Sequence, residues 1–370
     1  MPRTVWLLIG ARAINRLGAF SMTFLTVLVA TEFGVPATTA GLVAAAFGVA
    51  TIPSRLLGGY LADRVGRRAT ILLGLLGCAV AQAGIAVAPS LAVLTLFAVL
   101  LGLAFELYEP PSQAMIADEV PVALRTRAYS LLNAAMAAAG LGAGLIAAAV
   151  GRWDLRWLFV VDAVTCLACA IVVRLVLPAD RPARRGPARS AVWRDRALLA
   201  MLGIGTVFAT VYMTIVMVLP LTLAVPADAG ILSTVAALTL IAGQPLVRRQ
   251  SLTLGFVLLA ANLVGYGFAD SLPELIAVTV LGGIGELFLM GRLMAIVADL
   301  APDDARGRYL AFYGICWGFA TVIAPLAGTW LLEFAGARGL WLTLAGVTLA
   351  LAAGTARARV TRVAQPSALR

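Results

Sequence analysis

The sequence predicts an all-α polytopic membrane protein, with twelve transmembrane helices in two pseudo-symmetric six-helix halves. Three observations predict this class: long apolar runs between short charged loops, arginine concentrated in alternate loops, and an internal repeat. Hydrophobic residues make up 62% of the chain and charged residues only 12%. An average soluble domain carries about twice that charged fraction, so a soluble fold is excluded.

The apolar runs approach the roughly 20 residues with which a helix crosses a bilayer. They are continuous rather than alternating, which is typical of membrane helices. The first run contains Arg12 and Arg16, which the core of a cleavable signal peptide would exclude, so we expect it to remain as a span. The expected spans are 4–30, 39–61, 69–87, 91–116, 126–150, 157–177, 197–224, 228–246, 251–268, 273–299, 308–333 and 338–356.

The arginines predict the orientation of these spans. All 28 basic residues are arginine, and with the N-terminus inside, twenty of them lie in cytoplasmic loops and tails. The external loops hold three, namely Arg152, Arg156 and Arg338. Because membrane proteins retain arginine on the inner side, we expect both termini to be cytoplasmic in a multi-pass protein of the cell membrane. The arginines form no single basic face, so nucleic acid is not an expected partner.

The internal repeat predicts the domain organisation. At one offset of 181 residues, Arg67-Arg68 falls on Arg248-Arg249, and Asp118 falls on Asp299. Each copy holds six spans, which predicts two halves in parallel orientation. We expect an N-terminal half at 1–177, a basic cytoplasmic linker at 178–196, a C-terminal half at 197–356 and a cytoplasmic tail at 357–370.

A charged turn after the second run carries the most informative motif. It reads Gly-Tyr-Leu-Ala-Asp-Arg-Val-Gly-Arg-Arg and includes Gly59, Asp63, Arg64, Gly66, Arg67 and Arg68. This order closely resembles the signature between the second and third helices of the major facilitator superfamily. The glycine and proline stretch 324–328 resembles another motif of that family. The resemblance covers nearly the whole chain and is strongest to drug:proton antiporter-like members. It implies the major facilitator fold, alternating access and a cytoplasmic gating role for the motif.

Ionisable residues inside spans are the candidates for coupling. Each costs about 2.5–3.5 kcal/mol to insert, so each is expected to face the bundle interior. The proton- or substrate-coupling candidates are Glu106, Arg16, Glu286, Glu109 and Arg12. By the resemblance, Arg16, Glu106 and Glu286 would meet near the midplane of a central cavity. The alternative is that these residues form ion pairs between helices. Glu109 is also a candidate for the cytoplasmic gate, and Asp162 is expected to be a structural polar contact.

Aromatic and methionine residues of spans seven and eleven are candidates for a cavity wall. They are Tyr212, Met213, Met217, Tyr313 and Trp317. A mostly apolar cavity favours amphipathic or lipophilic substrates over sugars, whose hydroxyls need many partners. Plain helix packing is the alternative interpretation. The chain has no histidine, and its four cysteines lie inside apolar runs, so no metal and no cofactor are expected.

The function predicted first is proton-coupled export of small amphipathic compounds by a monomeric secondary transporter, an antiporter that is not an enzyme. The second hypothesis is a facilitator or symporter of the same fold that takes up a metabolite. A membrane-embedded transferase is the third hypothesis. The absence of histidine argues against it, because histidine is the commonest general base.

Overall fold

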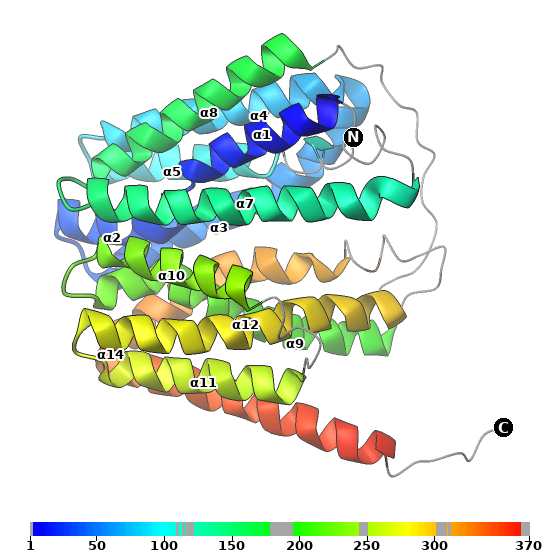
Figure 1. The fold of residues 1–370 in the computed structure, drawn as a ribbon. Coiled ribbons are helices and arrows are strands. Elements are labelled where there is room, and N and C mark those ends of the chain that lie inside the picture. The colour runs from blue at the N-terminus through cyan, green and yellow to red at the C-terminus, as the bar shows by residue number, and fades with distance from the viewer. Residues whose placement is uncertain are drawn as a thin grey trace. The chain divides into compact units, whose positions relative to one another are not determined.

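A computed structural model describes residues 3–108, 111–112, 115, 122–177, 195–243, 251–300, 309 and 312–363, and at some of these positions only the backbone. All regular elements in these ranges are α-helices (Figure 1). Six helices are long and apolar enough to cross a membrane, and five shorter apolar helices accompany them among the described residues. The expected all-α membrane class is therefore confirmed.

The chain forms two compact units. The first comprises Met1–Arg189, Met213–Thr234 and Thr321–Trp330, and the second comprises Ser190–Tyr212, Val235–Ala320 and Leu331–Arg370. Residues 178–194, which include most of the expected linker, lie outside the described residues, so the predicted domain boundaries stay a prediction.

Among the described residues of the first half of the chain, seven helices build most of the first unit. They are α1 (Arg3–Leu17), α2 (Ser21–Phe33), α3 (Ala37–Arg64), α4 (Arg67–Ala86), α5 (Leu91–Phe105), α7 (Val122–Val150) and α8 (Arg156–Val176). In Figure 1, α1 lies along α7 and α8. One core cluster joins α1, α4, α7 and α8 through side chains such as Leu8, Leu75, Leu132 and Val173.

The expected first span is divided into two helices. α1 ends at Leu17 and α2 begins at Ser21, with Gly18 in the connection. The Gly18 backbone lies so close to α8 that a Cβ there would be 2.1 Å from Thr165 Oγ1 and 2.8 Å from the Asp162 Cα. Glycine permits this approach because it has no side chain. The sequence analysis expected one continuous helix here, and that expectation is wrong.

The expected fourth span, 91–116, is also interrupted. α5 ends at Phe105, and residues 106–108 form a turn whose Glu106 N–H donates to Ser54 Oγ at 3.1 Å. Pro110 and Pro111 explain the early end, because proline disfavours helical backbone in the residue before it and cannot donate to a helix. Glu106 is consequently the C-cap residue of a helix instead of a mid-helix residue.

Parts of two later helices complete the first unit by close packing. These are α9 (Arg196–Thr222) and α10 (Asp228–Ala242). A Cβ at Gly144 of α7 would lie 2.5 Å from the Gly230 carbonyl oxygen and 2.1 Å from Thr234 Oγ1. The Thr26 hydroxyl donates to the Met217 carbonyl, and Arg152 pairs with Asp228. Small residues therefore bring these helices close together, as is common in membrane interiors.

The second unit contains α11 (Leu252–Phe268), α12 (Leu272–Leu300) and most of α14 (Ile315–Val363). α11 and α12 pack along their length, and the Tyr266 hydroxyl lies 2.8 Å from Thr279 Oγ1. α14 spans both of the last two expected spans, but its backbone leaves the helical region at Gly336, with φ of 70°. That conformation favours glycine, so the two predicted spans meet at this residue.

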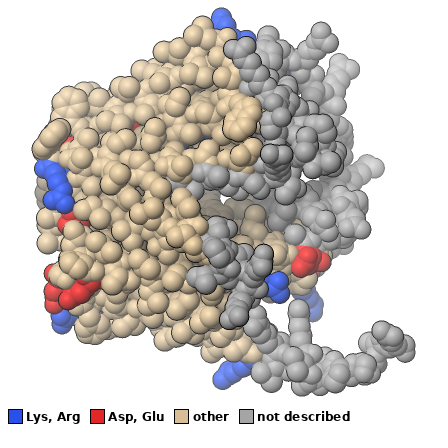
Figure 2. Space-filling model, viewed as in Figure 1, with Lys and Arg blue, Asp and Glu red and all other residues tan. Residues whose placement is uncertain are grey.

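The surface agrees with a lipid environment. On the face shown in Figure 2, the described surface is a wide area without charge, and charged side chains gather near its edges. Exposed apolar side chains such as Leu42, Val80, Leu167 and Leu349 lie on the helices themselves. A band of this kind would be unfavourable in water, whereas hydrocarbon accommodates it.

Candidate functional site

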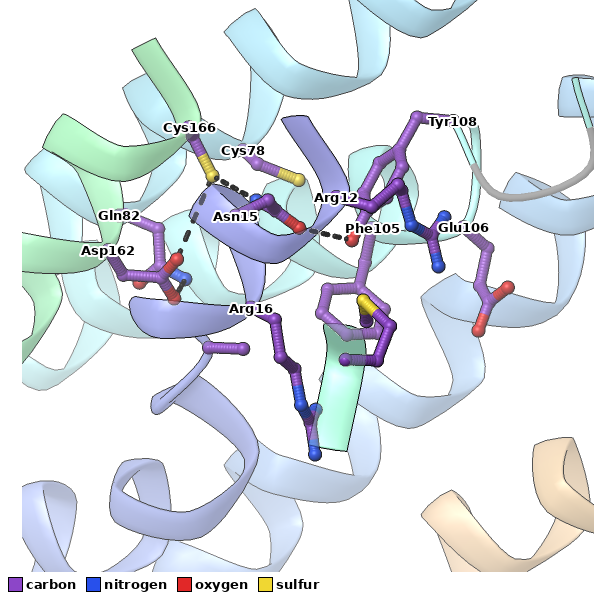
Figure 3. A pocket seen from close by; sticks show the side chains of 12 residues that line it. Arg12, Asn15, Arg16, Cys78, Gln82, Phe105, Glu106, Tyr108, Asp162 and Cys166 are labelled. Atoms are coloured by element: carbon purple, nitrogen blue, oxygen red, sulfur yellow. Dashed lines mark hydrogen bonds between the residues drawn. The ribbon is translucent and has the colours of Figure 1, made fainter. Parts of the chain in front are cut away.

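A pocket with several polar and charged side chains in its wall lies inside the first unit, among α1, α4, α7, α8 and the end of α5 (Figure 3). Its volume is about 130 Å³. Pockets for drug-sized ligands measure roughly 300–1,000 Å³, so this pocket suits water and ions better than a bulky substrate. The residues that line it are Arg12, Asn15, Arg16, Ala19, Cys78, Gln82, Phe105, Glu106, Tyr108, Met136, Asp162 and Cys166.

Residues at both helix interruptions line this pocket. Arg16 and Ala19 line it beside the end of α1, and Phe105 and Glu106 line it at the end of α5. The last carbonyl groups of a helix have no partner within the helix and carry partial negative charge. Two helix C-termini at one pocket therefore favour positive charge there, and Arg16 in the last turn of α1 supplies some of it.

A chain of hydrogen bonds crosses the pocket wall from the turn after α5 to α8. The Tyr108 hydroxyl donates to Asn15 Oδ1 at 2.9 Å, and Asn15 Nδ2 donates to Cys166 Sγ at 3.2 Å. Cys166 Sγ in turn donates to Asp162 Oδ1 at 3.7 Å. Gln82 of α4 donates its amide N–H to Asp162 Oδ2. Asp162 is 4% exposed, so this chain ends at a buried carboxylate.

Arg12 is held by Tyr108 and Ser112. Its NH1 donates to Ser112 Oγ at 3.1 Å, and its guanidinium carbon lies 5.3 Å from the centre of the Tyr108 ring. Arg12 is buried, whereas Arg16 one turn later is exposed and extends away from the Asp162–Gln82 pair in Figure 3. The two arginines thus share the pocket but have different surroundings.

Glu106 forms an ion pair with Arg55 of α3. Arg55 Nε lies 3.7 Å from Glu106 Oε2, and the two side chains are 48% and 24% exposed. Exposed pairs of this kind contribute about 0–1 kcal/mol, so the pair orients Glu106 more than it stabilises the fold. The sequence analysis expected Arg16 as the partner. Arg16 and Glu106 do line the same pocket, but the ion pair is made by Arg55.

Glu286, another predicted coupling residue, does not line this pocket. Glu286 is buried in α12 and belongs to the second unit. Glu109 lies outside the described residues. Their roles stay predictions.

The signature motif occupies the end of α3 and the start of α4. Gly59 and Asp63 belong to α3, although the Asp63 side chain lies outside the described part. Gly66 precedes α4 with φ of 106°, a conformation that explains the glycine. The basic residues of the motif have separate environments: Arg64 lies over the Tyr60 ring, Arg67 is the first residue of α4, and Arg68 donates to the Arg174 carbonyl.

The predicted cavity-wall residues fall into two groups. Met213 and Met217 belong to the first unit and are buried, while Tyr212, Tyr313 and Trp317 belong to the second. Trp317 packs edge to face on Tyr212, with ring centroids 5.5 Å apart. None of the five lines the pocket described here.

The sequence predicted no role for several residues at this site. Arg55 interrupts an apolar run as Arg16 and Glu106 do, and Asp162, which was expected only as a structural contact, does so too. The arrangement of the helices alone shows which of these residues are neighbours. Asn15, Gln82 and Cys166 carry no charge and offered no comparable signal. The four cysteines are all free and buried, as expected.

Solved transporters share this fold. The structure is similar to the crystal structure of a POT family transporter in complex with 5-aminolevulinic acid, with a TM-score of 0.80 and 95% of each chain covered. The two sequences are only 14% identical, so the likeness concerns the fold alone.

Sequence relatives are transporters as well. The chain is 27% identical over 307 residues to YhjO, an uncharacterized MFS-type transporter of Bacillus subtilis (strain 168), covering 78% of this chain and 76% of that protein. It is 29% identical over 297 residues to the multidrug resistance protein MdtH of Cronobacter sakazakii (strain ATCC BAA-894), covering 75% and 73%. The family model of the Major Facilitator Superfamily matches residues 8–249 and 246–369. This match covers nearly the whole chain and agrees with the helical membrane fold and the signature at Gly59–Arg68. The chain therefore belongs to the Major Facilitator Superfamily and is a membrane transporter, not an enzyme.

Proposed function

We propose that the protein exports small amphipathic or lipophilic compounds in exchange for protons, by alternating access across the cell membrane. The main support for this proposal is the small pocket of the first unit. Its wall contains the carboxyl groups of Glu106 and Asp162 together with Arg12 and Arg16. A pocket of about 130 Å³ can hold water and a proton but is small for a drug. The multidrug resistance name of the MdtH relative supports export of this substrate class.

The energetics of proton exchange are sufficient for export. One elementary charge that moves inward through 100 mV releases about 2.3 kcal/mol. Since each 1.4 kcal/mol is a factor of ten, one proton supports a substrate gradient of roughly forty-fold. The chain contains no phosphate-binding loop that would indicate a nucleotide as the energy source.

Glu106 is the first candidate for the coupling carboxylate. It lies at a helix end, lines the pocket and forms an ion pair with Arg55 at 3.7 Å, which a rearrangement of α3 against α5 would break. In this scheme Arg55 and Arg16 tune the charge of Glu106, and Glu286 of the second unit is the alternative. Protons and the substrate are the partners, and the transporter acts as a monomer.

The test has two stages. Cells with and without the protein are first screened for compounds whose accumulation differs, and export predicts lower accumulation in cells that contain it. Proteoliposomes then report proton release driven by the compound with the largest difference. We expect Glu106→Gln to release protons much more slowly than wild type, with Glu286→Gln as the second variant.

Asp270→Asn is the matched control, because Asp270 is an exposed acid between α11 and α12. Wild-type rates in both Glu variants would place the coupling group elsewhere. Higher accumulation in cells containing the protein would favour the uptake alternative instead.

A further inference from the structure

Asp162 and Glu106 are two carboxyl groups of the same pocket with different neighbours. Glu106 pairs with a guanidinium, which stabilises its ionised form. Asp162 accepts from the Gln82 amide and the Cys166 thiol, which are both uncharged donors. It nevertheless lies 4% exposed within a membrane helix, where an ionised carboxylate is costly.

The partners of Asp162 are compatible with both of its protonation states. An amide carries a donor and an acceptor, so rotation of the Gln82 amide allows it to accept from a protonated carboxyl group. A thiol likewise both donates and accepts weakly. Asp162 also lines the pocket, so water there can deliver a proton to it and take one away. The surroundings therefore permit a proton to bind and leave.

The hydrogen-bond chain that ends at Asp162 has one direction. Tyr108 donates to Asn15, Asn15 donates to Cys166, and Cys166 donates to Asp162. Bonds arranged in series polarise one another, and an anionic terminal acceptor strengthens the whole series. Protonation of Asp162 removes that charge and weakens each bond back to Tyr108, which lies in the turn of Glu106.

We infer that Asp162 is a second proton-exchange site of this pocket, and that Cys166, Asn15 and Tyr108 transmit its protonation to the turn that carries Glu106. A proton passes from pocket water to a carboxylate oxygen of Asp162. It returns to pocket water when the hydrogen bonds from Tyr108 to Asp162 regain their strength. Only the use of this proton in transport rests on the proposed function. Proton binding itself is a property of the pocket.

Other charged or titratable groups line the pocket together with Asp162 and would affect its titration. α7 contributes Met136 to the pocket, which does not titrate. The groups from the remaining elements are Arg12 and Arg16 of α1, Cys78 of α4, Glu106 and Tyr108 of the turn after α5, and Cys166 of α8 itself.

The test is infrared difference spectroscopy of the full chain in liposomes, titrated with acid and without any substrate. We expect a carboxylic acid C=O band that appears on acidification and is absent in Asp162→Asn. Asp162→Glu keeps a carboxyl group, so its band should remain at a changed frequency even if the asparagine variant folds poorly. Glu106→Gln is the control that should keep the Asp162 band.

The hydrogen-bond chain from Tyr108 to Asp162 is tested through the thiol S–H band of Cys166. This band should shift at the same pH as the Asp162 band and stay fixed in Asp162→Asn. Cys169→Ala is the matched control, because Cys169 is buried on the same helix three residues away, and the shift should survive there. A C=O band that persists in Asp162→Asn, or the absence of any titrating band at Asp162 in wild type, would overturn the inference.

The assay of substrate-driven proton release distinguishes a failure of this inference from a failure of the proposed function. If wild type shows the Asp162 band but no substrate-driven proton release, the proposed function fails and the proton site stands. If Asp162→Asn releases protons as wild type does while Glu106→Gln does not, the coupling role of Asp162 fails and the proposed function stands.

Discussion

Single residues decide how closely the helices around the pocket approach. Gly18 lies against Asp162 and Thr165 of α8, at the interruption between α1 and α2. The nearest atom, Thr165 Oγ1, can rotate away from an added methyl group, but the Asp162 Cα at 2.8 Å is backbone and cannot. The glycine is therefore a requirement of packing at the pocket.

We expect Gly18→Ala to destabilise the protein by about 1–3 kcal/mol, the usual cost of overpacking. The apparent melting temperature in detergent, measured beside wild type, checks this. Gly10→Ala is the control, since Gly10 lies in α1, which ends just before Gly18, and has no neighbouring atom within 4 Å of an added Cβ. Equal melting temperatures for the two variants would show that the contact with α8 does not restrict position 18.

Residues also differ in how well sequence predicts their role. Arg12, Arg16 and Glu106 were singled out because a charge in an apolar run is expected to face away from lipid, and all three line the pocket, although their coupling roles stay predictions. Asp162 was expected to be only a structural contact. Its place at the end of a hydrogen-bond chain depends on Asn15 and Tyr108, which lie far from it in sequence.

At the scale of elements, the start of α9 is fixed by a side-chain cap. Asp195 accepts from the N–H groups of Ala197 at 2.8 Å and Leu198 at 3.3 Å, and from the Tyr309 hydroxyl at 2.8 Å. Asp195 precedes the membrane-spanning segment. The Tyr309 hydrogen bond foremost, and then the Leu198 N–H, hold the pKa of Asp195 below its ordinary value.

This cap predicts an acid-dependent loss of stability. A carboxyl group whose pKa falls on folding stabilises the folded state above its unfolded pKa, and that contribution is lost as pH falls through the lowered, folded-state pKa. Asparagine also caps helices, so Asp195→Asn removes the charge and keeps a cap. We expect the melting temperature of wild type to exceed that of Asp195→Asn near neutral pH and to approach it in acid. A difference that stays constant with pH would contradict the prediction.

Elements were predicted better in position than in continuity. Hydropathy located the apolar runs, and Gly336 marks the boundary that separates the last two. The interruptions after Leu17 and Phe105 were missed, although Pro110 and Pro111 were visible signals for the second one. Gly18 alone was no such signal, because glycine is common inside membrane helices and only the neighbouring α8 gives this one its role.

For the whole molecule, the arginine distribution predicts the orientation in the membrane. We expect a membrane-impermeant thiol reagent to label Trp153→Cys in intact cells and Ala188→Cys only after permeabilisation. Trp153 is 85% exposed in the turn between α7 and α8, and the four native cysteines are buried, which keeps the background low. Labelling of Ala188→Cys in intact cells would reverse the predicted topology.

The sequence by itself determined the helical membrane class and, through the order of residues in the Gly59–Arg68 motif, the family. Composition and local order suffice for these properties, because bilayer insertion responds to the hydropathy of each run and tight turns require particular residues.

Only the tertiary structure decided that Glu106 pairs with Arg55, and that Asn15, Tyr108, Asp162 and Cys166 form one chain. A helix that is apolar on all sides has no polar face to show which way it turns. Its rotation is set by packing against every neighbour at once, so the partners of its few polar residues exist only once the helices are assembled.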